Sequence, residues 1–403
     1  MKKKKLVTAI IISVMTTALL AGCGATGTLA NPDSTTAESV KQETGNDTDA
    51  ADDTQKEAET VQTQDSADFD LEAAFAAETG VGEPIRIIST FEGTCQVQSQ
   101  IAYLLGFYDA EGLKEGVDYE FVESGGETGA VLLSTDQADV AIGLISGMLQ
   151  PLDNGLEAKA ILGLHTGCIT IVTMGDSGIH AAADLVGKTI GVTALSSSQH
   201  IAALRALNYE GYSGDDVEFV VYDADSIQQA LLNGAVDAIA IGDYKAAIMV
   251  QEEGARIIFD TSTDERLKDE NCCVFYASNK ALDRKPATLA KLVTAIQKAS
   301  VWIENNPELA AQIQVAQGYT VGDVNVNTEL LKTYKYPTSL TLLREAVYRN
   351  FDDAQALGLL KADTDKDALA ESSYIFLPGV ADGLDIKEIT PPYDPQQFLT
   401  TKE

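Results

Sequence analysis

The chain has 403 residues and a formal net charge of −33, from 28 basic and 61 acidic side chains. A surface this acidic excludes sequence-independent binding to nucleic acid phosphates, which needs clustered Lys and Arg. The length allows more than one compact lobe, and a hydrophobic content of 45% is sufficient for a buried core.

The N-terminus has the pattern of an export signal. Four lysines follow Met1, and residues 6–20 form an apolar stretch that is too short for a comfortable membrane span. The stretch ends in LAGC (20–23), which resembles the bacterial lipoprotein cleavage box; the alternative is an ordinary small-residue cleavage site. The resemblance implies that residues 1–23 are a lipoprotein signal peptide and that Cys23 carries the lipid anchor.

Residues 24–80 are predicted to form a disordered acidic linker. Between residues 31 and 80, fourteen acidic side chains stand against Lys41 and Lys56, with hardly any aromatic residues. Such a composition buries too little apolar surface to offset the entropy of the chain. Like charges would keep the segment extended.

From residue 85 to 278, short apolar runs of strand length alternate with helical patterns. This alternation predicts an α/β fold of mostly parallel sheets with helices on their faces. After residue 278 the patterns are helical only. The strands are expected at 85–90, 119–124, 139–143, 158–164, 169–174, 188–192, 217–223, 237–242, 255–260 and 273–278.

Two stretches repeat the same phrase. AVLLSTDQADVAIG (130–143) and ALLNGAVDAIAIG (230–242) each contain a helix end, a polar turn, an Asp and a strand that closes on Ala-Ile-Gly. The repetition indicates two related α/β lobes.

These features, with LGFYDAEGL (105–113) and AADLVGKTIGV (182–192), resemble the extracytoplasmic solute-binding proteins of ABC importers. The similar branch holds the sulfonate, taurine, nitrate and thiamine-pyrimidine-precursor binders, and the resemblance covers roughly residues 83–380. It implies a two-lobed, periplasmic-binding-protein-like (type II) clamp with a hinge of two crossing segments. Lobe one would comprise residues 81–168 and 278–385, lobe two residues 169–277, and residues 386–403 a C-terminal tail.

The resemblance also implies a function. The chain would capture a small polar or anionic solute in the cleft between the lobes and deliver it to a membrane permease and its ATPase. It would act as a monomer outside the bacterial cell membrane, anchored by Cys23, without a cofactor and without nucleic acid. The sequence contains no GxSxG, HExxH or Walker motif, so no catalytic residue is predicted and an enzyme is not expected. The alternative is an enzyme similar to the thiamine-pyrimidine synthases, or a soft-metal binder that uses the Cys and His residues.

Ligands of such folds bind outside the carboxyl ends of parallel strands, where helix N-termini point N–H groups into the cleft. One of the three consecutive serines at 196–198 is expected to cap the following helix. The candidate ligand-binding residues are Phe91, Glu92, Cys95, Gln96, Ser124, Ser146, His165, Ser196, Ser197, Ser198, Asp243, Cys272 and Cys273.

The cysteines and His165 are expected to face one cleft or hinge under this topology. Three interpretations remain open: ordinary core residues, a disulfide from Cys95 to Cys168 or from Cys168 to Cys272, and a pocket lining that could hold a soft metal. The candidate metal ligands are His165, Cys168, Cys272 and Cys273, although their spacing matches no standard zinc module.

Overall fold

The computed structural model describes residues 69–89, 93–125, 127–320 and 322–400, which all belong to one compact unit, Val61–Glu403. The predicted signal peptide, Cys23 and most of the predicted linker lie outside the described residues. Within the described part of the chain, no helix combines the length and the apolar character that a membrane crossing needs.

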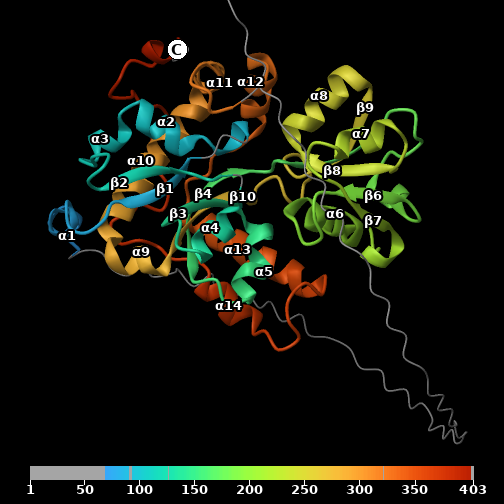
Figure 1. Cartoon of the computed structure of the whole chain (residues 1–403), viewed down its shortest axis with the longest axis horizontal. Helices are drawn as coiled ribbons and strands as arrows, with labels where there is room; N and C mark the ends of the chain where they lie inside the picture. The colour runs from blue at the N-terminus through green and yellow to red at the C-terminus, as the bar shows by residue number, and fades with distance from the viewer. Residues whose placement is uncertain (1–68, 90–92, 126, 321, 401–403) are drawn as a thin grey trace, which may run out of the picture. The chain divides into compact units, whose positions relative to one another are not determined.

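The first of two mixed sheets has the strand order β2-β1-β3-β10-β4 (Figure 1). β1 runs parallel to β2 and β3, while β10 lies antiparallel between β3 and β4. The bounds are Ile85–Ser89 for β1, Tyr119–Glu123 for β2, Val140–Leu144 for β3, Ala158–Thr166 for β4 and Asn271–Ser278 for β10.

The second sheet repeats this plan with the order β7-β6-β8-β5-β9. β6 runs parallel to β7 and β8, and β5 lies antiparallel between β8 and β9. The bounds are Ile169–Met174 for β5, Thr189–Val192 for β6, Glu218–Val221 for β7, Ala238–Gly242 for β8 and Ala255–Asp260 for β9. All ten predicted strands form, and the two repeated phrases end in β3 and β8, which hold equivalent places in the two sheets.

The chain crosses between the sheets twice, from β4 to β5 and from β9 to β10. The second crossing corrects one predicted boundary. The strand Asn271–Ser278 was assigned to lobe two through residue 277, but it pairs with β3 and β4 of the first sheet. Its apolar residues Val274, Phe275 and Tyr276 are buried on both faces there, which is why the strand belongs to the core of lobe one.

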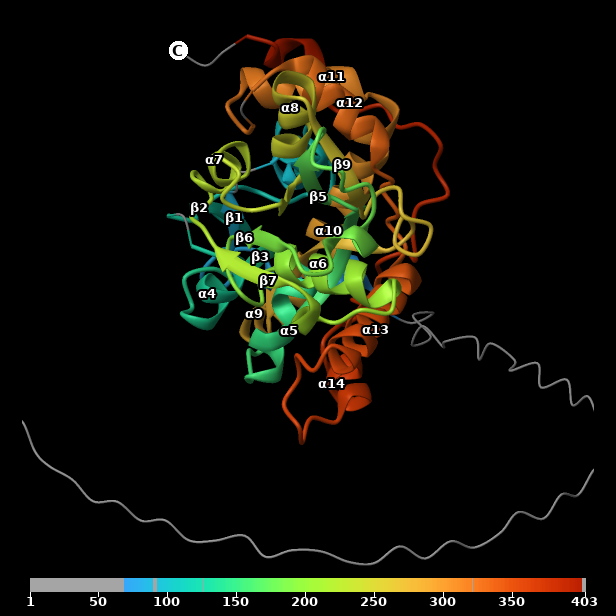
Figure 2. The same ribbon diagram turned by 90° about the vertical axis from the view of Figure 1, so that its right-hand side faces the viewer.

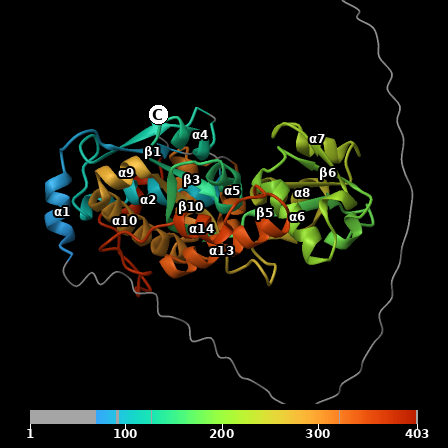
Figure 3. The same ribbon diagram turned by 90° about the horizontal axis from the view of Figure 1, so that it is seen from below.

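Helices cover both faces of the first sheet. Helices α2, α3, α10, α11 and α12 pack on one face. Helices α4, α5, α13 and α14 pack on the other, as Figure 3 shows for α13 and α14. The bounds are Gln98–Leu104 for α2, Phe107–Ala110 for α3, Gly129–Ser134 for α4, Ile145–Asp153 for α5, Asn279–Arg284 for α9, Pro286–Asn305 for α10, Pro307–Ala316 for α11, Val324–Thr333 for α12, Leu340–Ala356 for α13 and Lys366–Ser372 for α14.

The second sheet is covered by α6 on one face and by α7 and α8 on the other. These helices span Ser198–Tyr209 (α6), Ile227–Leu232 (α7) and Asp243–Glu253 (α8). The contacts between the lobes include α5 with α6, α6 with α13 through Arg205 and Asp353, and α8 with α12, which lie beside each other in Figure 2.

The end of the predicted linker is helical, which corrects its boundary at residue 80. Helix α1, Leu71–Glu78, begins at Asp70, whose side chain accepts a hydrogen bond from the Ala73 N–H at 2.9 Å. Phe75 is buried against α10, with the Lys291 ammonium 4.9 Å from its ring centre. Glu78 also accepts hydrogen bonds from the first N–H groups of α10. Composition averaged over the linker conceals this helix because a few specific contacts hold it.

The predicted C-terminal tail packs against lobe one. Its short 3₁₀ helix η5, Pro395–Phe398, contacts α11. The ring of Tyr393 lies so close to Gly106 that a Cβ there would meet it at 2.8 Å, and Gly106 has a φ of +80°. Glycine therefore satisfies both the left-handed backbone and the close approach.

Candidate functional site

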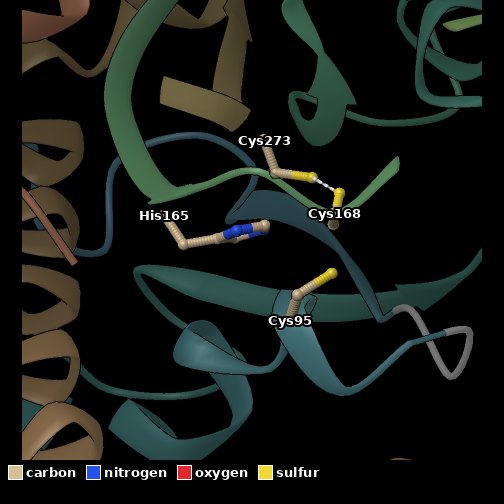
Figure 4. Close-up of side chains that lie close together, drawn as sticks. All are labelled: Cys95, His165, Cys168 and Cys273. Atoms are coloured by element: carbon tan, nitrogen blue, oxygen red, sulfur yellow. Dashed lines mark hydrogen bonds between the residues drawn. The ribbon is translucent and has the colours of Figure 1, made fainter. Parts of the chain in front are cut away.

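Four side chains converge where both crossings leave the first sheet. Cys95 lies in the short helix η2 (Thr94–Gln96) after β1, His165 near the end of β4, Cys168 in the first crossing and Cys273 on β10. Their sulfur and imidazole nitrogen atoms all lie within 4.8 Å of one another, and all four side chains are buried (Figure 4). We call these four residues the Cys/His cluster.

The convergence follows from strand pairing. Cys273 is in register with His165 between β10 and β4, so the two side chains start from adjacent strands. The ring of Tyr334 packs on the other side of His165, with ring centres 4.9 Å apart. The His165 Nδ1 lies 2.8 Å from the carbonyl oxygen of Thr166, to which it donates.

The cysteines of the described residues are free thiols, so neither predicted disulfide forms. The Sγ atom of Cys168 lies 3.3 Å from that of Cys272 and 3.8 Å from that of Cys273, well beyond a sulfur–sulfur bond. Gln96 donates from Nε2 to the sulfur of Cys273 at 3.6 Å. Cys272 is half-buried and stands at the edge of the cluster.

The cluster strongly perturbs its own ionisation. Hydrogen bonds from the Cys168 and Cys273 thiols hold the pKa of Cys95 well below its usual range. Hydrogen bonds from Cys168 and Cys272 lower the pKa of Cys273 to about 7. Burial lowers the pKa of His165, but the charges of Cys273 and Cys95 outweigh burial and raise it. These shifts favour thiolates at Cys95 and Cys273 beside an imidazolium at His165, whereas hydrogen bonds with Cys272 and Cys273 raise the pKa of the Cys168 thiol.

A pocket lies beside the cluster, between the two lobes. Cys272 connects the two features, since it lines the pocket and its sulfur contacts Cys168. The lining comes from both lobes and both crossings: Ile145, Ser146, Gly167, Ile169, Ala202, Arg205, Thr261, Leu267, Glu270, Asn271, Cys272 and Asn350.

The side chain of Asn271 is the least satisfied group of this lining. It is 1% exposed, and within the described residues neither amide atom has a hydrogen-bond partner. The amide packs against Gly163 of β4, and a Cβ atom on residue 163 would lie 2.5 Å from it. A buried amide without partners is costly, so the pocket offers a donor and an acceptor to a polar guest.

The N-terminus of α5 adds further donors to the pocket. Ile145 and Ser146 lie in its first turn, and within the described residues the N-cap Leu144 provides no side-chain hydrogen bond to this end of the helix. Its first N–H groups are therefore available to a polar or negatively charged group.

A buried ion pair joins the lobes at the pocket wall. Arg205 of α6 donates to both carboxylate oxygens of Glu270 at 2.8 and 2.9 Å. Its Nε lies 2.7 Å from Oδ2 of Asp353 on α13, and Asn350 donates to Glu270 at 2.9 Å. The positive charge of Arg205 is thus already compensated within the protein.

The three consecutive serines lie at the N-terminus of α6. Ser197 is the cap, with its Oγ accepting from the His200 N–H at 3.2 Å. Ser196 has a φ of +67°, and its N–H donates to Nδ1 of His200. Ser198 is buried against Gly147 of α5, and a Cβ atom on residue 147 would lie 2.6 Å from the serine Oγ. The N-terminal turns of α5 and α6 are therefore in close contact.

Asp243 lies at the other contact between the lobes. It is the first residue of α8 and accepts a hydrogen bond from the Tyr334 hydroxyl of lobe one. Burial raises its pKa to about 7, against the opposing effect of that hydrogen bond. Because Tyr334 also packs on His165, Asp243 adjoins the cluster through one ring.

The remaining predicted site residues are scattered. Ser124 follows β2, the edge strand of the first sheet, and is half-buried. Phe91 and Glu92 lie outside the described residues. The sequence reasoning missed Arg205, Glu270 and Asn271, because charged or amide side chains on a helix or beside a Cys pair are no different in sequence from surface residues.

Comparison with solved structures identifies the fold. An alkanesulfonate-binding protein of Xanthomonas axonopodis pv. citri, solved with MOPS, is 19% identical with a TM-score of 0.58 and covers 72% of this chain and 98% of its own. The nitrate-binding protein NrtA of Synechocystis PCC 6803 is 14% identical with a TM-score of 0.57, over 79% and 97%. The desulfurization enzyme DSZB is 20% identical with a TM-score of 0.52, over 72% and 96%.

The chain therefore has the two-lobed fold of the periplasmic-binding proteins. The model of the NMT1/THI5-like family matches residues 100–310, which is more than half of the sequence. The chain belongs to the NMT1/THI5-like family. A search of curated proteins finds no match.

Proposed function

We propose that this protein is the solute-binding component of an ABC importer and that it captures a small polar or anionic solute between its lobes. The observation that carries the proposal is the pocket, because both lobes and both crossings contribute to its lining. A guest there would contact every segment that moves when such lobes open or close.

Within the pocket, Asn271 and the first turn of α5 are proposed to hold the solute. The amide of Asn271 supplies one donor and one acceptor, and the N–H groups at Ile145 and Ser146 supply further donors. Cys272 and Thr261 line the same pocket and add polar side chains to it. The similar structures of an alkanesulfonate-binding and a nitrate-binding protein support a small polar or anionic solute.

The N-terminal features complete the proposal. Cys23 would carry a lipid that anchors the mature chain outside the cell membrane, and residues up to Asp70 would serve as the tether. The protein would bind as a monomer and pass its solute to a permease with its ATPase. Replacing Cys23 with Ser should release the chain from membranes into the medium, which immunoblotting of the two fractions measures.

A thermal-shift screen tests the binding function. The panel contains alkanesulfonates, nitrate, bicarbonate, pyrimidines and amino acids, because a solute that binds only the folded clamp raises its melting temperature by mass action. At a solute concentration of 100 Kd the stabilisation is about 2.7 kcal/mol. Mass analysis should recover the solute unchanged; a chemically altered solute would instead favour the enzyme alternative.

Asn271→Leu provides the matching variant. It removes both amide groups while keeping most of the volume, so the best solute should bind at least about tenfold more weakly, the effect of one lost hydrogen bond. Asn279→Leu is the control, because Asn279 follows the opposite end of β10. Equal affinities of the two variants would place the solute elsewhere.

A further inference from the structure

The structure carries a second site besides the solute pocket. We propose that Cys95, His165, Cys168 and Cys273 bind a thiophilic transition-metal cation of the Zn²⁺ or Cu⁺ type. Their donor atoms already lie within 4.8 Å of one another, although they are up to 178 positions apart in the sequence.

The spacing of the sulfur atoms fits a tetrahedral ion. Zinc–sulfur bonds of about 2.3 Å in a tetrahedral site place neighbouring sulfurs about 3.8 Å apart. The Sγ atoms of Cys168 and Cys273 are separated by 3.8 Å. In Figure 4 the thiol of Cys95 and the ring of His165 are directed toward the same space as these two sulfurs. Ligation by all four donors would need the longest of their separations, at most 4.8 Å, to shorten by about 1 Å.

The imidazole of His165 is already held as a metal ligand would be. Its Nδ1 is engaged with the carbonyl oxygen of Thr166 at 2.8 Å, which fixes the ring and leaves Nε2 as the outward nitrogen. Nε2 is fully buried, and no hydrogen-bond partner for it lies among the described residues. Histidines that ligate a metal usually donate a hydrogen bond from one ring nitrogen to a group such as a backbone carbonyl and bind the metal through the other nitrogen. A histidine that merely filled the core would have both nitrogens bonded.

The chemistry of the donors selects the class of ion. Three thiols and one imidazole suit Zn²⁺ and Cu⁺, whereas Mg²⁺ and Ca²⁺ require oxygen ligands. Binding would deprotonate the donors and hold the resulting thiolates, which otherwise repel one another in the buried site. The cation would also join η2 to both crossings and so link occupancy of the site to the hinge.

Cys272 is excluded from the ligand set. Its sulfur is 3.3 Å from that of Cys168, closer than two ligands of one tetrahedral ion stand, and its side chain faces the pocket. It marks the route by which an ion reaches the cluster, because it borders both the pocket and Cys168. It also provides a control cysteine within the same dipeptide as the ligand Cys273.

The test is a competition titration of the full chain, purified under reducing and metal-free conditions. Zn²⁺ is added against a chromophoric chelator, Cu⁺ is titrated in a parallel arm, and Mg²⁺ serves as the negative control. We expect one ion per chain in at least one arm. Cys95→Ser and Cys273→Ser should each weaken binding at least about 100-fold, since the loss of an outer-shell partner alone costs up to that factor. Cys272→Ser should retain the stoichiometry and change the affinity less than tenfold.

X-ray absorption of the metal-loaded wild-type chain provides a readout that does not depend on how the variants fold. Three sulfur ligands and one nitrogen ligand are expected around the ion. A shell of oxygen and nitrogen only, the lack of stoichiometric binding in both arms, or an equal loss in Cys272→Ser and Cys273→Ser would each overturn the proposal. The solute screen is unaffected by these outcomes, so the proposed transport function stands or falls separately.

Discussion

Replacing Arg205 with Met tests the ion pair that connects the lobes. The substitution keeps an unbranched side chain in α6 but removes the guanidinium, which contacts Glu270 at 2.8 and 2.9 Å and Asp353 at 2.7 Å. Glu270 is only 8% exposed, and it would keep Asn350 as a donor at 2.9 Å and the exposed Arg349, whose Nε lies 3.7 Å from its Oε2.

The cost arises mainly from the carboxylate that is left behind. Removing one partner of a buried ion pair destabilises a protein by about 3–5 kcal/mol, because the other charge stays buried without compensation. If this reasoning holds, replacing Glu270 with Met as well should restore at least about 1 kcal/mol, since a buried pair exchanged for apolar groups is close to neutral. The half-buried Asp353 remains in the double variant and prevents full recovery.

Urea unfolding followed by circular dichroism measures the free energies of unfolding, with Arg344→Met on α13 as a control outside the pair. Similar m-values for the variants and the wild type would show that the same surface is exposed on unfolding. A cost below about 1 kcal/mol for Arg205→Met, or a double variant less stable than the single one, would refute the argument.

Three further predictions concern the pocket, the hinge and helix α1. Gly163→Ala should displace the Asn271 amide, weaken solute binding and lower the stability by about 1–3 kcal/mol. Calorimetric titration measures the affinity and urea unfolding the stability. An unchanged affinity would contradict the role of Asn271. The pKa of Asp243 is raised from 3.8 to about 7, so its contribution to stability is full below pH 3.8 and is lost as pH rises through 7. Between pH 4 and 8 the melting temperature should therefore fall less steeply in Asp243→Asn than in the wild type. Parallel curves for the two proteins would contradict the raised pKa. Phe75→Ala should cost about 2 kcal/mol through lost burial against α10 and speed proteolysis near residue 75, whereas Phe75→Leu should retain most of the stability.

The elements of the fold could be predicted from sequence because buried parallel strands are nearly continuous apolar runs. AIAIG, which is β8 and runs parallel to β6, shows this, and ITIVTM, the antiparallel strand β5, is an equally continuous apolar run because it too lies inside its sheet. The partner of a strand is less visible. CVFYAS has the same apolar character whichever sheet it joins, so its place beside β3 and β4 depends on the path of the chain after Asp260. Helix α1 is hidden in the sequence for a different reason, since it depends on contacts with the distant α10: the burial of Phe75, and the bonds of Glu72 and Glu78.

Of the site, the sequence indicated the gathering of Cys95, His165 and the later cysteines, because the resemblance placed Cys95 in the loop after the first strand and the others at the two crossings, all facing one cleft or hinge. It could not separate Cys272 from Cys273, since alternation and a local irregularity of β10 decide which sulfur faces the cluster. Arg205 and Glu270 lie 65 positions apart and look like two of many charges in an acidic chain. Only their burial distinguishes them.

Hydrogen exchange of the full chain, with and without the best solute of the screen, tests capture between the lobes most directly. We expect the solute to slow exchange together at the first turn of α5, around Ala202 to Arg205 in α6 and around Glu270 to Cys272, because these segments from both lobes and a crossing surround one pocket. Protection confined to one lobe, or spread over surfaces away from these three segments, would contradict it.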